Sequence, residues 1–355
     1  MARVLVTGGA GTIGCAVVRR LLGDPAWEVR VCDHRPAPDW MLQGCEVHTG
    51  DLREAACAQT ALNGCSHVIH LAAIVGGIAN FHKLPYTLTE VNNALTGAVV
   101  SAALRQDVER FVYVSSSMVL ERVTEFPTTE EHLADCPAPR SAYGFSKLAG
   151  EVYTRAAHDQ HGLRYTICRP FNAYGPGEQP DLDEPGIAHA VPDLIAKALR
   201  GQTPLEIFGS GEQTRTLTHV EDIANGIVAA MASPAAENED FNISASQELS
   251  VAEIAREIWR ACGQDPSSLV FRHLPSFAVD VQRRWPSVEK ARRMLGWEAQ
   301  VDLAAGIAQT VDWLRGQAPA GLRGPAADGG LAAGARATRN AGPGADAGPG
   351  APSGG

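Results

Sequence analysis

The sequence has 355 residues, of which 45% are hydrophobic and 20% are charged, and its formal net charge is −10. These values predict an ordinary soluble protein with a large core, and the acidic charge argues against a nucleic-acid partner, which would need a basic face. No apolar run is long enough to cross a bilayer, no leader precedes the first strand and the eight cysteines lack metal spacing, so we expect a cytoplasmic protein with no membrane segment and no metal site.

A strand, a glycine turn and a helix open the chain. Residues 3–7 form a short apolar run, and apolar residues recur at helical spacing over 17–22. Between them lie three glycines with the spacing G-x-x-G-x-x-G: Gly8, Gly11 and Gly14. Backbone N–H groups at a helix N-terminus can bind a pyrophosphate, and small residues let the backbone approach it. This order therefore predicts a dinucleotide-binding turn.

A second strand over residues 28–32 ends in Asp33, nineteen residues past Gly14. A carboxylate at this place can bind both hydroxyls of the adenosine ribose and would repel a 2′-phosphate. We therefore expect NAD as the cofactor and not NADP, although Arg35 is close enough to weaken this argument. The alternative is that Asp33 is an ordinary turn residue.

Further strands are predicted at 45–48, 66–73 and 110–115, with helices at 54–62 and about 86–105 between them. This alternation predicts an α/β fold, a Rossmann-type doubly wound parallel sheet with ligands at the carboxyl ends of its strands. We expect an NAD-binding domain over 1–170, to which about 214–245 return, and a smaller mixed α/β substrate-binding lobe over 171–213 and 246–315. Residues 316–355 are mostly Gly, Ala and Pro and predict a disordered tail.

Tyr143 and Lys147 are four residues apart, so on a helix their side chains would share one face. An ammonium group next to a phenol favours the phenolate and lowers its pKa. Such a tyrosine can take a proton from a hydroxyl while a hydride leaves the same carbon. The serine run 115–117 lies about thirty residues earlier. The alternative is an exposed helix on which Lys147 is only solvated.

A set of motifs occurs in one order along the chain, at residues 7–14, 50–52, 70–73, 115–116, 143–147, 169–176, 208–215, 219–222, 241–243 and 295–297. With these motifs the chain resembles the extended short-chain dehydrogenase/reductases of the nucleotide-sugar epimerase and dehydratase family, over about residues 3–315. The resemblance implies bound NAD, a nucleoside diphosphate sugar lying over the nicotinamide, and oxidation of the sugar at C4. It also implies a homodimer formed through the two helices that follow Tyr86 and Tyr143.

The resemblance assigns roles to individual residues. The catalytic residues would be Ser116, Tyr143 and Lys147; Ser116 is chosen because it lies four residues before Leu120, where the family usually has a tyrosine. The implied NAD-binding residues are Gly8, Gly11, Thr12, Ile13, Gly14, Asp33, Asp51, Leu52, Leu71, Ala72, Ala73, Tyr143, Lys147 and Pro170. The implied substrate-binding residues are Gly76, Gly77, Ser117, Asn172, Arg215 and Arg284, with Arg283 as a further candidate. For the arginines, the alternative is pairing with surface carboxylates.

The type of reaction depends on the residue two beyond the catalytic serine, which is Met118. A thioether cannot act as a base on the adjacent carbon, so a 4,6-dehydratase is disfavoured, whereas a C4 epimerase needs no second base. The loop at Gly76 and Gly77 resembles GDP-mannose 3,5-epimerase and GDP-fucose synthase, and His189 falls where those enzymes carry their proton donor; the alternative for His189 is a phosphate contact or a helix-start residue.

We therefore expect an NAD-dependent nucleoside diphosphate sugar epimerase that acts through transient oxidation at C4, with a GDP-sugar favoured. The reaction is either C4 epimerisation or one like that of GDP-mannose 3,5-epimerase, with Met118 leaving the acid/base pair incomplete. The alternatives are a net reductase or dehydratase of such a sugar, and a non-catalytic NAD-binding protein of the same fold.

Overall fold

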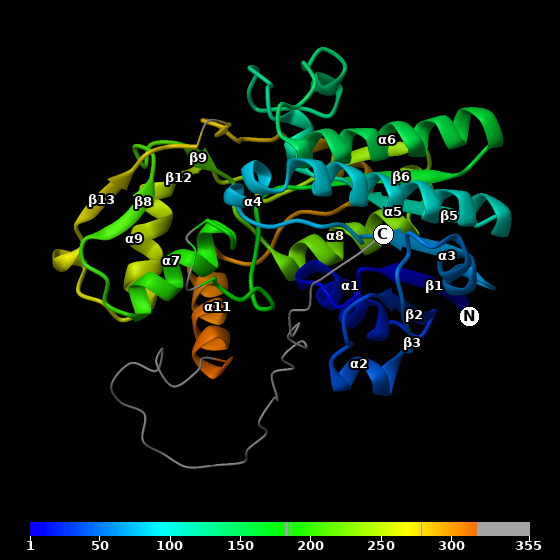
Figure 1. Cartoon of the computed structure of the whole chain (residues 1–355), viewed down its shortest axis with the longest axis horizontal. Coiled ribbons are helices and arrows are strands. Elements are labelled where there is room, and N and C mark those ends of the chain that lie inside the picture. Colours follow the sequence, from blue (N-terminus) through cyan, green and yellow to red (C-terminus); the bar gives the residue numbers. More distant parts are fainter. Residues whose placement is uncertain (182–183, 185, 278, 318–355) are drawn as a thin grey trace, which may run out of the picture. The chain divides into compact units, whose positions relative to one another are not determined.

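The computed structural model describes residues 1–181, 184, 186–277 and 279–317. A parallel seven-stranded sheet with the strand order β11-β6-β5-β4-β1-β2-β3 forms its centre (Figure 1). Its strands are β1 (Ala2–Thr7), β2 (Trp27–Asp33), β3 (Glu46–Thr49), β4 (His67–His70), β5 (Arg110–Val114), β6 (Tyr165–Pro170) and β11 (Glu239–Ile243). The strand order reverses between β1 and β4, and this confirms the predicted Rossmann-type doubly wound fold.

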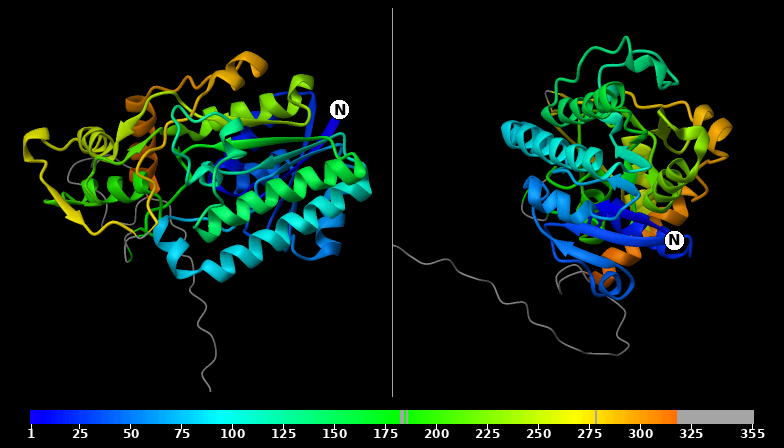
Figure 2. Two further views of the ribbon diagram at one scale, coloured as in Figure 1. Left: turned by 90° about the horizontal axis from the view of Figure 1, so that it is seen from above. Right: turned by 90° about the vertical axis from the view of Figure 1, so that its right-hand side faces the viewer.

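Helices cover both faces of this sheet. The apolar side chains of α1 (Thr12–Leu22) and α8 (Val220–Ala232) pack on one face, near α2 (Asp39–Gly44) and α10 (Glu289–Leu295). On the other face pack α3 (Ala55–Leu62), α5 (Pro85–Gln106) and α6 (Ala142–His161), of which α5 and α6 lie side by side (Figure 2). Because both faces are covered, the central strands are buried apolar runs and do not alternate.

A third apolar cluster joins α7 (Ala190–Leu199), α9 (Val251–Ala261) and α11 (Leu303–Gln317) to the parallel pair β8 (Leu205–Phe208) and β13 (Phe271–Leu274). Two further pairs are β7 (Ala173–Tyr174) with β10 (Thr218–His219), and β9 (Thr214–Arg215) with β12 (Leu249–Ser250). The remaining short elements are α4 (Ile78–Lys83) and the 3₁₀ turns Ser117–Leu120, Glu131–Leu133, Pro234–Ala236 and Pro266–Ser268. No helix in the described ranges is long and apolar enough to span a membrane.

Two predicted boundaries differ from the structure. The fourth strand ends at His70 and not at residue 73, because the N–H of Ala72 turns to the side chain of Thr7 (3.3 Å to Oγ1). The predicted tail begins at Gly316, but Gly316 and Gln317 still belong to α11. Residues 318–355, the rest of that predicted tail, lie outside the described part of the chain.

A buried ion-pair network fixes α6 to the sheet. The guanidinium of Arg169 on β6 donates two hydrogen bonds of 2.8 Å to the carboxylate of Glu151 on α6 and one of 2.6 Å to Asp240 on β11. Ser115, directly after β5, donates to the same Glu151 carboxylate (2.6 Å). Lys290 on α10 completes the network with a contact of 2.9 Å to Asp240. Since Arg169 and Glu151 are fully buried, separating them would leave uncompensated charges in the interior.

Candidate functional site

The glycine turn between β1 and α1 has no room for side chains. Gly8 has a φ of +70°, and a Cβ atom there would lie 2.8 Å from the backbone nitrogen of Ala72. A Cβ atom on Gly14 would lie 2.2 Å from the carbonyl oxygen of Gly8. Gly11 caps the helix, which starts at Thr12 and Ile13. The turn thus brings bare backbone to a helix N-terminus, an arrangement that fits a pyrophosphate.

Asp33 lies at the end of β2 beside this turn. Its carboxylate is buried and accepts hydrogen bonds from the backbone N–H groups of Ala10 (3.0 Å) and Arg35 (2.9 Å). Burial alone would raise the pKa of Asp33, but the hydrogen bonds from Arg35 and Ala10 keep the pKa below its usual value. The Arg35 guanidinium pairs with this carboxylate (3.3 Å) and reaches to within 3.2 Å of the Cβ position of Gly11. The ionised carboxylate fits the ribose hydroxyls of a dinucleotide.

The other predicted NAD-binding residues follow the strands at the same edge of the sheet. Asp51 and Leu52 come after β3, residues 71–73 come after β4, and Pro170 ends β6. Leu52 is buried, whereas Asp51 is partly exposed and pairs with Arg53 (2.6 Å). A later loop reaches this edge too, since a Cβ atom on Gly177 would lie 3.2 Å from the methyl group of Thr12.

Ser116, Tyr143 and Lys147 are brought together at the carboxyl end of β5. Ser116 is the second residue after this strand, and its side chain faces the phenol of Tyr143, whose pKa it lowers. Tyr143 and Lys147 lie in the first turns of α6. Ser141 caps this helix, and its hydroxyl accepts a hydrogen bond from the N–H of Gly144 (3.1 Å). The side chains of Ser116, Tyr143 and Lys147 are buried.

The electrostatics of this group differ from the prediction. The ammonium group of Lys147 donates to the carbonyl oxygen of Val114 (2.8 Å), and burial lowers its pKa to about 8. Burial raises the pKa of Tyr143 to about 12, while the hydrogen bond with Ser116 and the positive charge of Arg284 oppose this rise. The prediction that Lys147 lowers the pKa of Tyr143 is therefore wrong for this structure, because Lys147 turns to the β5 backbone and Arg284 is the cation that acts on the phenol.

His189 pairs with a carboxylate that sequence analysis missed. It caps the N-terminus of α7, and both its backbone N–H (2.9 Å) and its Nδ1 (2.7 Å) contact the carboxylate of Glu178. Burial lowers the pKa of the imidazole, but the charge of Glu178 and its hydrogen bond reverse this effect and leave the pKa above its ordinary value. The two residues are eleven positions apart and share no helical or strand spacing, so no periodic pattern could have predicted the pairing.

The predicted glycine loop packs directly against the segment that leads to His189. The N–H of Gly77 donates to the carbonyl oxygen of Ile187 (2.6 Å), and that of Ala79 donates to Gly186 (3.0 Å). A Cβ atom on Gly77 would lie 2.1 Å from the carbonyl oxygen of Ala188. Gly77 therefore serves close backbone packing, and its neighbour Gly76 is partly exposed.

The helix that follows this loop, α4, places an aromatic ring on Tyr143. Phe81 on α4 stacks on Tyr143, with 5.1 Å between the ring centroids and 11° between the ring planes. Met118 and Leu88 complete the apolar cluster around the tyrosine. Phe81 was missed because nothing in the spacing of the sequence relates a loop after the fourth strand to a helix sixty residues later.

The predicted substrate-binding polar residues have partners within the chain. Arg215 pairs with Asp280 (2.9 Å) and donates to the carbonyl oxygens of Thr214 and Val281. Asn172 donates to the carbonyl oxygen of Thr216 (3.0 Å). Arg284 donates to the hydroxyl of Ser117 (3.1 Å) and contacts the sulfur of Met118. Arg283 is exposed and pairs with Glu248 (2.8 Å), away from Tyr143.

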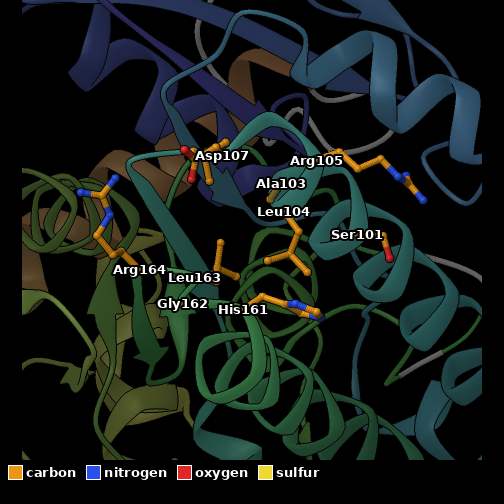
Figure 3. A pocket seen from close by; sticks show the side chains of 10 residues that line it. Ser101, Ala103, Leu104, Arg105, Asp107, His161, Gly162, Leu163 and Arg164 are labelled. Carbon is orange, nitrogen blue, oxygen red and sulfur yellow. The ribbon is translucent and has the colours of Figure 1, made fainter.

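An open cavity of 490 Å³ lies at the opposite edge of the sheet (Figure 3). It is formed where α5 and α6 end, and its lining includes Arg105, Asp107, His161 and Arg164. Helix C-termini present carbonyl groups there, which makes the place unfavourable for an anion. None of the predicted site residues lines this cavity, so we place the candidate site at the carboxyl edge.

Comparisons with known proteins identify the family of this chain. The sequence profile of the NAD dependent epimerase/dehydratase family matches residues 4–244. The UDP-glucose 4-epimerase of Mycolicibacterium smegmatis is 32% identical over 322 residues, which cover 88% of this chain and 98% of the relative.

Two solved structures are similar over nearly their whole length. The dTDP-glucose 4,6-dehydratase DesIV of Streptomyces venezuelae, solved with NAD and TYD bound, is 30% identical with a TM-score of 0.78, covering 88% of this chain and 97% of that one. The UDP-glucuronic acid 4-epimerase of Bacillus cereus, in complex with UDP-glucuronic acid and NAD, is 26% identical with a TM-score of 0.79, covering 89% of this chain and 100% of that one.

The bare glycine turn and the ionised Asp33 fit the NAD that these relatives bind. With the family profile covering most of its length and its sheet ordered as in a Rossmann fold, this chain belongs to the NAD-dependent epimerase/dehydratase family of extended short-chain dehydrogenase/reductases.

Proposed function

We propose that this protein is an NAD-dependent nucleoside diphosphate sugar epimerase that acts by transient oxidation at sugar C4. The observation that carries the proposal is the buried group Ser116, Tyr143 and Lys147 at the carboxyl end of β5, on the same sheet edge as the glycine turn. Residues 1–170 with 214–245 would bind the cofactor, and residues 171–213 with 246–315 would bind the sugar nucleotide.

The cofactor would be held by the glycine turn, by Asp33 and by the residues after β3 and β4. When bound, NAD supplies a hydride acceptor for the sugar carbon and returns the hydride later. Tyr143 takes the proton of the C4 hydroxyl, and Ser116, which faces the phenol, orients that hydroxyl. Arg284 and Ser116 both favour the phenolate against the burial that raises its pKa. Returning the proton from Tyr143 completes a cycle without net redox change.

Met118 supports epimerisation over elimination. Its side chain packs on Tyr143 and contacts Arg284, so the position two beyond the catalytic serine carries a thioether and no base. A 4,6-dehydration needs a base at the carbon next to the ketone, whereas inversion at C4 requires only that the keto sugar present its other face.

A second reaction of the same class is favoured by a specific observation. His189, paired with Glu178, lies next to the glycine loop, and a raised pKa suits a proton donor. Oxidation at C4 would acidify the protons at C3 and C5. His189 in its neutral form would remove one of them and then return a proton to the opposite face of that carbon after the sugar has turned over. This loop favours a GDP-sugar, while the relatives above act on UDP- or dTDP-sugars, so all three nucleotides belong in the test.

The test is proton NMR of GDP-, UDP- and dTDP-sugars incubated with the enzyme in D₂O. Inversion at C4 without deuterium uptake is expected for the simple reaction, and deuterium at C3 or C5 would indicate the His189 reaction. Tyr143→Phe should reduce turnover by about 10²-fold or more, in the range of general acid–base contributions. Tyr153→Phe, on the exposed face of the same helix, is the matched control and should leave turnover unchanged.

Three outcomes would contradict the proposal. A stoichiometric change in nicotinamide absorbance with product would indicate a net reductase. Loss of water from the sugar would indicate a dehydratase. No turnover on any sugar of the panel, with NAD still bound, would favour a non-catalytic NAD-binding protein.

A further inference from the structure

Arg284 differs from the arginines beside it in having no carboxylate partner. Arg215 pairs with Asp280 (2.9 Å), and Arg283 pairs with Glu248 (2.8 Å). Among residues 1–181, 184, 186–277 and 279–317, no carboxylate oxygen lies within 4 Å of the Arg284 guanidinium. Its contacts are the hydroxyl of Ser117 and the sulfur of Met118.

The hydrogen-bonding capacity of Arg284 is only partly used. A guanidinium has five N–H donors, and here the buried Nε has no partner among the described residues, while a thioether is a weak acceptor. The nearby carboxylates are already engaged, since Asp280 holds Arg215 and Glu121 accepts the N–H groups of Arg140 and Ser141 at the start of α6. Burial lowers the pKa of Arg284 to about 9, so the surroundings disfavour its charge. A cation in this situation fits an anionic ligand.

The place of Arg284 indicates which anion of a nucleotide sugar it would meet. Ser117, to which it donates, directly follows Ser116, which faces the phenol of Tyr143. Arg284 also acts on the pKa of Tyr143, so its guanidinium lies beside the groups proposed to act on C4. In a pyranose ring C5 is bonded to C4, whereas C1, which carries the diphosphate, is on the opposite side of the ring. A group beside C4 thus lies nearer to a substituent of C5 than to the diphosphate.

We propose that Arg284 binds a carboxylate on C5 of the sugar, so that the substrates are nucleoside diphosphate uronic acids. This inference rests on the proposed function for the position of C4. A guanidinium and a carboxylate form two parallel hydrogen bonds, and the planar fork of Arg284 can supply both donors. A sugar with a neutral hydroxymethyl group on C5 would instead leave the positive charge of Arg284 uncompensated. Arg215, held by Asp280 and two carbonyl groups, remains the candidate for the diphosphate.

The test compares dissociation constants for matched ligands in the NAD-loaded Tyr143→Phe protein, so that no ligand is consumed. The pairs are UDP-glucuronate with UDP-glucose and GDP-mannuronate with GDP-mannose, with UDP and GDP alone reporting the diphosphate. We expect at least one uronate to bind about tenfold or more tightly than its neutral partner, as a charge-assisted bidentate pair allows. Adding Arg284→Gln should reduce that ratio to about twofold or less and leave the affinity for free UDP or GDP unchanged.

Controls separate this role from a structural one. Arg283→Gln, which removes the neighbouring exposed charge, should keep the full preference. Arg284→Lys keeps the charge without the planar fork and should give an intermediate ratio. Retention of NAD binding and of the melting temperature shows that a variant is folded, and if Arg284→Gln fails this check, the Arg284→Lys ratio decides.

Two results would overturn the inference. Equal affinity for uronate and neutral sugar in the parent protein would exclude a carboxylate site. A loss of affinity for free UDP or GDP as large as that for the uronates would assign Arg284 to the diphosphate. These outcomes are independent of turnover: if no sugar is epimerised but the uronate preference depends on Arg284, the proposed function fails and the carboxylate site stands.

Discussion

At the scale of single residues, the carboxylate of Glu178 determines the direction in which the pKa of His189 is shifted. In the structure the Glu178 carboxylate raises the pKa of the imidazole, while burial and Arg284 lower it. Glu178→Gln removes the raising influence and leaves the two lowering ones, so the pKa of His189 should fall below its ordinary value. The imidazole would then take up its proton only at a lower pH than in the parent protein. Titration of the His189 ring protons by NMR measures the change.

The matched control for this titration is Glu212→Gln, which neutralises an exposed carboxylate on a loop. It should leave the titration of His189 unchanged. An unchanged pKa of His189 in Glu178→Gln would mean that the contact of 2.7 Å does not govern this imidazole.

Residues with a local signature could be predicted, and residues defined by contacts between distant segments could not. Gly8, Gly11 and Gly14 were predicted because a dinucleotide turn leaves their spacing in the sequence. The ring of Phe81 on Tyr143 and the approach of Arg284 to Ser117 depend on tertiary packing that leaves no periodicity. The spacing of Tyr143 and Lys147 predicted that the ammonium group acts on the phenol. In the structure this group donates to the carbonyl oxygen of Val114, because helical spacing fixes the face of a side chain but not its hydrogen-bond acceptor.

At the scale of elements, backbone contact at Gly77 joins the loop before α4 to the segment before α7. Gly77→Ala would place a methyl group about 2 Å from two carbonyl oxygens, those of Gly186 and Ala188, so the two segments must separate. We expect a lower melting temperature and a displaced His189, detected as a changed titration of its ring protons and as reduced turnover.

Gly97→Ala is the matched control at this scale. Gly97 lies within α5, and a Cβ atom there would meet no heavy atom within 4 Å. Since alanine is the better helix former, this variant should be more stable by up to about 1 kcal/mol. Equal melting temperatures for Gly77→Ala and the parent protein would show that the segments accommodate the methyl group.

The strands and helices between residues 3 and 115 were predicted within a few residues, because continuous apolar runs and helical spacing mark them in the sequence. The end of β4 was not, because Ala72 exchanges a ladder bond for the hydroxyl of Thr7, and this choice depends on a side chain sixty-five residues earlier. The ion pairs from α6 to β6 and β11 were also not predicted, since charged residues in apolar strands give no indication of their partners.

At the scale of the whole molecule we predict a homodimer formed through α5 and α6. Large apolar side chains are exposed along these helices or at their start: Tyr86 (79%), Phe145 (47%), Val152 (59%) and Tyr153 (45%). Such a group of exposed apolar residues marks an interaction surface. Val152→Glu would bury a charge in this interface and should shift the molar mass in light scattering from dimer to monomer. Val270→Glu, at another exposed valine, should leave it unchanged.

The buried pairing of Arg169 with Glu151 and Asp240 affects how a ligand enters. Sliding of α6, which carries Tyr143, along the sheet would pull apart the buried charges of Arg169 and Glu151, so we expect this wall to stay in place. The facing wall is held by two backbone hydrogen bonds from Gly77 and Ala79, by the ion pair of Lys83 with Glu184, and by two pairs of stacked rings, Phe81 with Tyr143 and His82 with Phe277. Admission of a sugar nucleotide should therefore proceed by outward rotation of α4, with the proton-transfer groups staying in place.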